Sequence, residues 1–164
     1  MDAICLSDKP PEVVGSFLRE LLKPQVKSMF FNVKTQDREI VSLLFLPSTV
    51  FYGLYKESQA EPAGVMFFLN VLPHENSFVY MGLFDETDRK KALSTNVYNF
   101  IRQDLLTRCP TLNSIETMII ENPELEKALV ELGFEKIGTR KHYKRIGEKY
   151  LDVTTFYYLC NEEK

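Results

Sequence analysis

The first part of the chain, residues 1–47, carries a helical pattern of apolar side chains. Between Val14 and Leu22 the apolar residues recur three and four positions apart, which places them on one face of a helix. A pair of prolines precedes this stretch, where proline is tolerated, and Pro24 ends it. The apolar run 38–46 fits a buried helix or a strand, and its lack of turn residues favours the helix. We therefore predict a mainly helical first part.

After residue 47 the pattern changes to short runs of β-branched and aromatic residues, separated by turn signals and by two helical stretches. We predict strands at 49–55, 63–70, 77–84, 114–120, 135–144 and 150–160, and helices at 89–108 and 122–133. The last strand is apolar on both faces, so we expect it inside the sheet and not at an edge.

The two helices of this second part are predicted from different features of the sequence. The apolar face that defines the longer helix consists of Leu93, Val97, Phe100, Ile101 and Leu105. The shorter helix begins with Asn122, which can cap it, and ends at Gly133, where a left-handed residue is needed. The order of elements predicts a mixed α/β (α+β) fold, with a mostly antiparallel central sheet and helices on both of its faces.

Length and composition fit one globular domain over 1–164, with 45% hydrophobic and 26% charged residues. The net charge of -3 argues against a nucleic-acid surface, and we interpret the basic run 140–145 as a solvated strand and turn. No apolar run approaches the ~20 residues that span a bilayer, and the N-terminus has no leader pattern. We expect a cytoplasmic protein that binds neither nucleic acid nor membrane.

The cysteines and histidines predict no metal site. Cys5, Cys109 and Cys160 are odd in number, and their spacing suits neither a disulfide framework nor a metal. His74 and His142 lie far apart and have no cysteine companions at metal-binding spacing. We expect reduced thiols and no bound metal.

The segment 121–159 carries the most informative motifs of the chain. They read Glu121-Asn122-Pro123, Leu-Val-Glu-Leu-Gly-Phe at 129–134, Ile-Gly at 137–138 and Tyr-Leu-Asp-Val at 150–153. This segment resembles the C-terminal half of GNAT acyltransferases (acyl-CoA N-acyltransferases), most closely the branch that acetylates ribosomal-protein N-termini and small amines. With the strand order, the resemblance extends loosely from residue 49 to the end of the chain. It implies a coenzyme A-binding half at 48–164 and an acceptor-binding half at 1–47.

The resemblance implies a site for the coenzyme A pyrophosphate at the start of the long helix, where backbone N–H groups attract an anion. The residues that match this site are Arg89, Lys90, Lys91, Ala92, Ser94 and Thr95. Family members usually have glycines where this chain has Lys90 and Ala92. Two interpretations stay open: the cations add contacts to the phosphates, or the site has decayed and the cluster is a solvated first turn.

The resemblance also places the thioester of acetyl-CoA, or of another acyl-CoA, in a cleft where the strands 77–84 and 114–120 separate. Backbone N–H groups there would hold the pantetheine arm and polarise the thioester carbonyl, as oxyanion donors do. The residues expected to contact the coenzyme in this cleft are Met81, Leu83, Phe84 and Asn122.

Direct attack by a neutral amine needs a base that removes a proton and an acid for the leaving thiolate. The residues that we predict to be catalytic are Glu121, which ends a strand beside the cleft, and Tyr143. The tyrosine that many family members use would match Leu129, and the serine of the N-terminal acetylating branch would match Leu125. Tyr143 is therefore a candidate replacement, as is Tyr80. Further candidates for the base are Glu116, Asp85 and Glu86.

We conclude that the sequence predicts an acyl-CoA-dependent N-acyltransferase that acylates an amine of a small molecule or a protein. The alternative is a catalytically inactive GNAT-like module that binds or regulates, and an α/β domain with an unrelated binding role is a third interpretation. The first part of the chain matches no motif, so the acceptor is not predicted. Aromatic residues at 30–31, 51–52 and 67–68 fit a core better than an interface, and a homodimer stays open.

Overall fold

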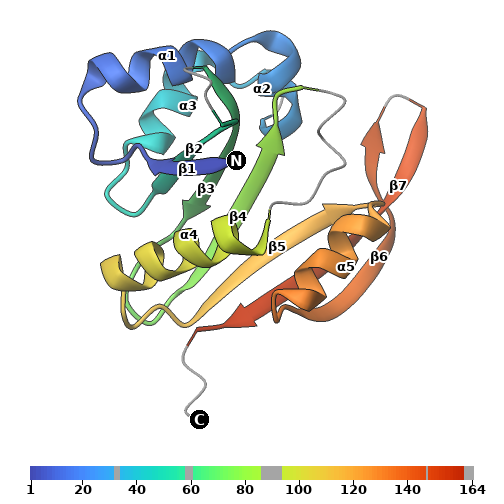
Figure 1. Ribbon diagram of the computed structural model, residues 1–164. Helices are drawn as coiled ribbons and strands as arrows, with labels where there is room; N and C mark the ends of the chain where they lie inside the picture. Colours follow the sequence, from blue (N-terminus) through green and yellow to red (C-terminus); the bar gives the residue numbers. More distant parts are fainter. Residues whose placement is uncertain (32–33, 58–60, 86–93, 147, 161–164) are drawn as a thin grey trace.

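The β-branched and aromatic runs of the sequence form the strands of one central sheet (Figure 1). The computed structural model describes residues 1–31, 34–57, 61–85, 94–146 and 148–160. Within these residues the strands are β1 (Asp2–Cys5), β2 (Val50–Tyr55), β3 (Pro62–Leu69), β4 (Asn76–Leu83), β5 (Ser114–Ile120), β6 (Glu135–Ile146) and β7 (Lys149–Leu159). Their order in the sheet is β1-β2-β3-β4-β5-β7-β6, and every neighbouring pair except β4–β5 is antiparallel.

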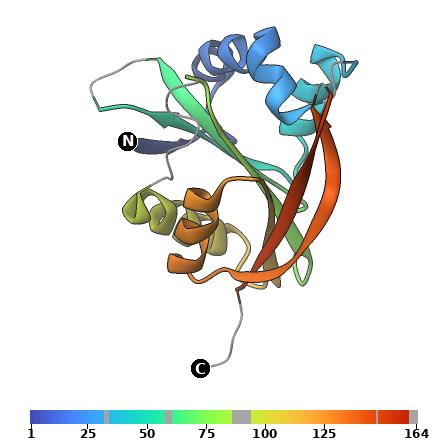
Figure 2. The same ribbon diagram turned by 90° about the vertical axis from the view of Figure 1, so that its right-hand side faces the viewer.

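Helices cover both faces of this sheet (Figures 1 and 2). The described helices are α1 (Pro11–Leu21), α2 (Pro24–Phe30), α3 (Asp37–Leu44), α4 (Thr95–Arg108) and α5 (Pro123–Glu131). The first three lie over one face of the β2–β4 half, and α4 and α5 lie on the opposite face. The predicted mixed α/β fold with a mostly antiparallel sheet is therefore confirmed, as is the internal position of the last strand, β7.

The aromatic pairs of β2 and β3 divide between two hydrophobic cores. Phe51 and Phe67 face α1, α2 and α3, whereas Tyr52 and Phe68 face the α4 side, and all four are buried. Adjacent strand residues point to opposite faces, so one pair of neighbours can serve both cores. The prediction that these aromatics form core is confirmed.

The first part of the chain is less helical than predicted, because it begins with a strand. Asp2–Cys5 pairs antiparallel with β2 and forms the edge of the sheet. Its four residues alternate in exposure, but so short an alternation is too weak to stand out in the sequence. The helix predicted at 38–46 is confirmed as α3.

The long helix begins later than the predicted residue 89. Ser94 has extended backbone (φ -62°, ψ 145°) and caps α4, and the residues 89–93 lie outside the described part of the chain. Phe100 is 52% exposed, so its assignment to the buried face was wrong. Tyr98 takes that place, because it packs edge-on against Phe134 at a centroid distance of 5.6 Å.

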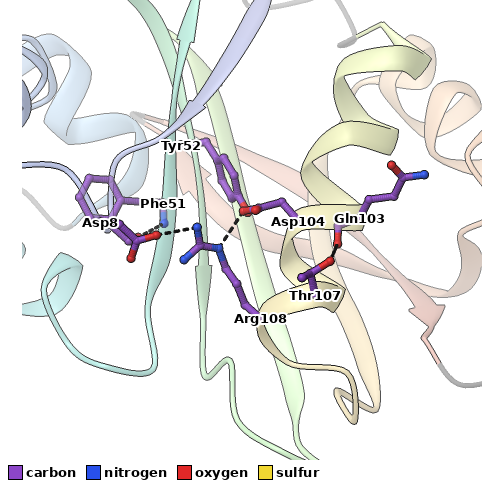
Figure 3. Close-up of polar contacts among 8 residues, drawn as sticks. Asp8, Phe51, Tyr52, Gln103, Asp104, Thr107 and Arg108 are labelled. Atoms are coloured by element: carbon purple, nitrogen blue, oxygen red, sulfur yellow. Dashed lines mark hydrogen bonds and ion pairs between the residues drawn. The ribbon is translucent and has the colours of Figure 1, made fainter.

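A cluster of polar side chains holds α4 against β2 and against the segment after β1 (Figure 3). The hydroxyl of Tyr52 on β2 donates a hydrogen bond to Asp104 Oδ2 on α4 (2.7 Å), and Arg108 Nε donates to the same oxygen (2.8 Å). Arg108 also pairs with Asp8, in the segment after β1 (2.6 Å). Burial alone would raise the pKa of Asp104, but the hydrogen bonds from Arg108 and Tyr52 outweigh burial and lower it. The cluster thus joins three separate parts of the chain.

Replacing Asp104 with alanine should lower the free energy of unfolding by about 1–3 kcal/mol, because the buried Tyr52 hydroxyl loses its acceptor. The Tyr52→Phe change removes that hydroxyl, so the double variant should cost less than the sum of the two single changes. Urea unfolding of the four proteins measures this coupling, and strictly additive values would contradict it.

The hydrogen bonds to Asp104 also make the free energy of unfolding depend on pH. The folded-state pKa of Asp104 is lowered from 3.8, so its stabilisation is present at neutral pH and is lost as the pH falls through that lowered value. The stability difference between the native chain and Asp104→Asn should therefore shrink below about pH 3.8.

Candidate functional site

The sheet opens between β4 and β5 (Figure 1). Side chains around this opening line a cavity of about 350 Å³. Only Asn76 to Phe78 of β4 pair with β5, and the two strands separate beyond that point, as the resemblance implied. The cavity is lined by α4 and α5 on one face of the sheet, by α2 on the other, and by residues of the strands β3 to β7 between them. A ligand that enters it can therefore contact groups on both faces.

Backbone groups on the open edge of β4 point into this gap. The Phe84 N–H donates to the Ala63 carbonyl on the β3 side (2.8 Å). Because successive residues of an antiparallel strand alternate in direction, Met81 and Leu83 turn their N–H groups the other way, towards β5. Thr117 of β5 donates its hydroxyl to the Val79 carbonyl on this same edge (3.2 Å).

This alternation separates the three residues that we predicted as donors. Met81 and Leu83 direct backbone N–H groups at the gap, and Met81 also lines the cavity. The Phe84 N–H is bonded within the sheet, so its main chain does not face the gap.

The N-terminus of α4 lies one turn from the cavity wall. Ser94 caps the helix by accepting a hydrogen bond from the Val97 N–H (3.4 Å), and Thr95 is its first residue. Tyr98, one turn further, lines the cavity. The four other residues that we predicted to contact the pyrophosphate, Arg89, Lys90, Lys91 and Ala92, lie outside the described part of the chain.

On the α5 side, Asn122 both caps the helix and lines the cavity. Its Oδ1 accepts a hydrogen bond from the Leu125 N–H (3.1 Å), so the predicted cap is confirmed. Leu125 and Leu129 also line the cavity, where the resemblance would place a serine and a tyrosine. Gly133 ends the helix with φ 88°, as predicted.

A bulge in β6 brings Tyr143 and Lys144 to the cavity. The register of β6 against β7 shifts between Arg140 and Lys144, and His142 within this segment has φ 52°. The His142 N–H donates to Asp152 Oδ1 on β7 (2.8 Å), which gives this unpaired backbone group a partner. The Asp of the Tyr-Leu-Asp-Val motif thus holds the bulge in shape.

Glu121 supports the same arrangement from the end of β5. It has φ 34°, an uncommon value that turns the chain from β5 into α5. Its Oε1 accepts the Asp152 N–H (3.0 Å), so the carboxylate links β5 to β7. Tyr143 lines the cavity, whereas Glu121 lies beside it and is not among the described residues of the wall. Their roles as base and acid stay predictions.

Tyr98 is a residue of this site that sequence reasoning missed. It lines the cavity and is 4% exposed, and its hydroxyl has no hydrogen-bond partner within the described residues. Burial raises its pKa far above the usual range, although nearby Arg102 opposes the shift. The signal in the sequence was a tyrosine on the apolar face of the long helix.

The N-terminal part contributes Met29 and Phe30 from α2 to the opposite wall. Phe30 can lie close to β4 because the strand has Gly82 there, and a Cβ at that position would collide with its ring. The ring also packs edge-on against Phe67, with centroids 5.6 Å apart.

The described residues contain neither a metal-binding cluster nor a membrane-spanning helix. No three side chains among His, Cys, Asp and Glu come together there in a way that could hold a metal ion. None of the helices in this part of the chain is long and apolar enough to cross a membrane.

No protein-family model and no curated protein matches the chain, but solved structures are similar to it in fold. Spermidine N-acetyltransferase from Vibrio cholerae, solved with CoA and spermine, gives a TM-score of 0.70 at 14% identity, over 96% of this chain and 95% of that chain. A chimera of Vibrio cholerae spermidine N-acetyltransferase and hSSAT gives 0.70 at 15% identity, over 98% and 96%. A probable acetyltransferase from Staphylococcus epidermidis gives 0.65 at 12% identity, over 96% and 98%.

These similarities show that the chain has the GNAT acyltransferase fold. At such low identity they carry the fold alone. None of the three proteins is named as a ribosomal-protein acetyltransferase, so the resemblance to that branch stays a prediction.

Replacing Tyr98 with phenylalanine should leave the free energy of unfolding unchanged or raise it, because the change removes a buried hydroxyl that lacks a partner. The matched control is Tyr52→Phe, which removes a bonded hydroxyl and should lose about 1 kcal/mol. Equal losses in the two variants, measured by urea unfolding, would mean that the Tyr98 hydroxyl is bonded.

The Gly82→Ala change should lower the free energy of unfolding by about 1–3 kcal/mol, because the new methyl group displaces Phe30. Gly15→Ala is the control: its Cβ meets nothing within 4 Å, and alanine favours the helix by about 0.5–1 kcal/mol. Thermal unfolding should therefore shift in opposite directions for the two variants. A neutral Gly82→Ala would show that Phe30 does not need its place over β4.

Proposed function

We propose that this chain is an acyl-CoA-dependent N-acyltransferase, with acetyl-CoA as the first donor to test. The observation that carries the proposal is the gap between β4 and β5, into which Met81 and Leu83 direct backbone N–H groups. A thioester arm bound along this edge of β4 would accept hydrogen bonds from these two N–H groups, with which β5 does not pair. The similarity to acetyltransferase structures, one of them solved with CoA, supports it.

The groups around the gap would contact first the pyrophosphate and then the pantetheine arm of an acyl-CoA. The N-terminus of α4, with Ser94 and Thr95, supplies backbone donors and a positive dipole end for the pyrophosphate. Arg89, Lys90 and Lys91 precede it in sequence and would add cations, with Ala92 completing the stretch. The pantetheine arm would then pass Tyr98 and Asn122 along the cavity wall.

Acetyl-CoA supplies an activated acyl group. The chain would position this group, accept a proton from the amine and donate one to the leaving thiolate. The N–H groups of Met81 and Leu83 would polarise the thioester carbonyl. Glu121 would accept the proton of the attacking amine, through a water, since it lies beside the wall. Tyr143 would donate a proton to the leaving thiolate. Tyr98 is a second candidate for that step, because it lines the cavity and its hydroxyl has no hydrogen-bond partner within the described residues.

The alternative of a non-catalytic acyl-CoA-binding module rests on α5. Leu125 and Leu129 put aliphatic side chains where the resemblance would place the serine and tyrosine hydroxyls. Binding without turnover would favour this alternative.

Filling the cavity should abolish coenzyme binding. Ala128 lines the cavity, so Ala128→Trp should remove binding of acetyl-CoA measured by calorimetric titration. Val130→Trp on the same helix is the control: this side chain is 58% exposed and lies outside the wall, so binding should persist. No binding of acetyl-CoA to the native chain at millimolar concentration would contradict the proposal.

Two further variants separate the phosphate site from the chemistry. Lys90→Glu should weaken binding roughly tenfold if the cations contact the phosphates, whereas Lys127→Glu, on the exposed side of α5, should not. Glu121→Gln and Tyr143→Phe should leave binding intact and slow the amine-dependent release of free CoA. Binding by the native chain with no release for any amine would select the non-catalytic module.

A further inference from the structure

The cavity wall is strongly enriched in methionine. The chain has five methionines, and Met29, Met66, Met81 and Met118 line the cavity, so that only Met1 lies elsewhere. Methionine is flexible and polarizable, and it adapts to apolar ligands of different shape. Four of five residues of one type around a single space indicate a wall that receives apolar groups.

The acceptor would enter from the α2 side. Helices α4 and α5, with the proposed coenzyme contacts, lie on one face of the sheet, so the amine would approach from the other. On that face α2 contributes Met29 and Phe30, and the strands contribute Tyr80, Met118 and Ile120. Met118 is 48% exposed, which makes it an accessible part of this wall.

The described residues of the cavity wall include no negatively charged side chain that could pair with a polycation. Among its described residues the one charged side chain is Lys144, which is positive. Two of its polar groups already have internal partners: the Thr117 hydroxyl donates to Val79, and the Asn122 carbonyl oxygen accepts from Leu125. The nearby Glu121 carboxylate accepts the Asp152 N–H and lies outside the wall.

A spermidine-like acceptor has several ammonium groups, and only one of them loses its proton to react. The others would lie against methionine and aromatic side chains or near Lys144, and a buried ammonium without a partner is costly. An acceptor with one amine and an apolar tail needs no such partner and gains from burial of its tail.

We propose that the acceptor is an apolar primary amine, of the alkyl or arylalkyl class, and not a polyamine. The inference rests on the proposed acyltransferase function, and it assigns the apolar tail to the wall of Met29, Phe30 and Met118. The fold that this chain shares with spermidine N-acetyltransferases does not decide the acceptor, because the acceptor contacts side chains and not the fold.

A series of amines with alkyl tails of increasing length tests whether the wall binds the apolar tail. With acetyl-CoA as donor, kcat/KM should rise roughly two- to fourfold for each methylene from butylamine to hexylamine, and phenethylamine should exceed spermidine. A flat series, or spermidine as the better substrate, would overturn the inference and leave the acyltransferase function standing. Calorimetric titration of hexylamine and spermidine without coenzyme keeps the wall testable even if acetyl-CoA does not bind, and tighter binding of spermidine would again overturn it.

A charge placed on the wall gives the second test. Met118→Glu should lower kcat/KM for hexylamine about tenfold and raise it for spermidine, because the new carboxylate pairs with an ammonium group. Leu72→Glu is the matched control: Leu72 is 42% exposed and lies outside the wall, so both values should stay unchanged. Equal effects of the two variants on hexylamine would mean that its tail does not contact this wall.

Discussion

The incomplete pairing of β4 with β5 is the constraint on which the rest of the site depends. Three residue pairs join the strands, from Asn76↔Ser114 to Phe78↔Glu116, and then the ladder stops inside the sheet. An interruption there leaves backbone N–H and C=O groups that need partners. Thr117 supplies one partner through its hydroxyl bond to Val79, and the N–H groups of Met81 and Leu83 remain directed at the gap. A sheet built in this way has its binding groups in place before any ligand arrives.

Both ends of the chain are needed to turn this gap into a cavity. Gly82 lets Phe30 of α2 lie against β4 from one side. From the other side the β6 bulge presents Tyr143, and the hydrogen bonds from His142 to Asp152 and from Asp152 to Glu121 hold that bulge against the end of β5. The carboxylate that we propose as base is therefore also a structural contact, so its substitution tests both roles at once.

The sequence predicted the elements well where local chemistry decides them. Asn122 and Gly133 mark the ends of α5 through a cap and a left-handed residue, and both were recognised from the chain alone. Tyr98 could not be predicted in the same way, because Tyr98 and Phe100 both suit an apolar face. Tyr98 packs against Phe134, which comes from a distant part of the chain, and Phe100 is left exposed. The β6 bulge was missed for a similar reason, since the Asp152 contact that shapes it joins two strands.

The composition of the cavity wall was out of reach of the sequence for a further reason. Met29, Met66, Met81 and Met118 are spread over α2, β3, β4 and β5, and no spacing rule connects them. In the sequence each would be assigned to ordinary core packing, because methionine commonly fills irregular gaps there. Once the sheet opens between β4 and β5, the same four side chains surround one space whose single described charge is Lys144. Strand pairing thus decides where a ligand can bind, and side chains from separate elements decide which ligand gains by binding there.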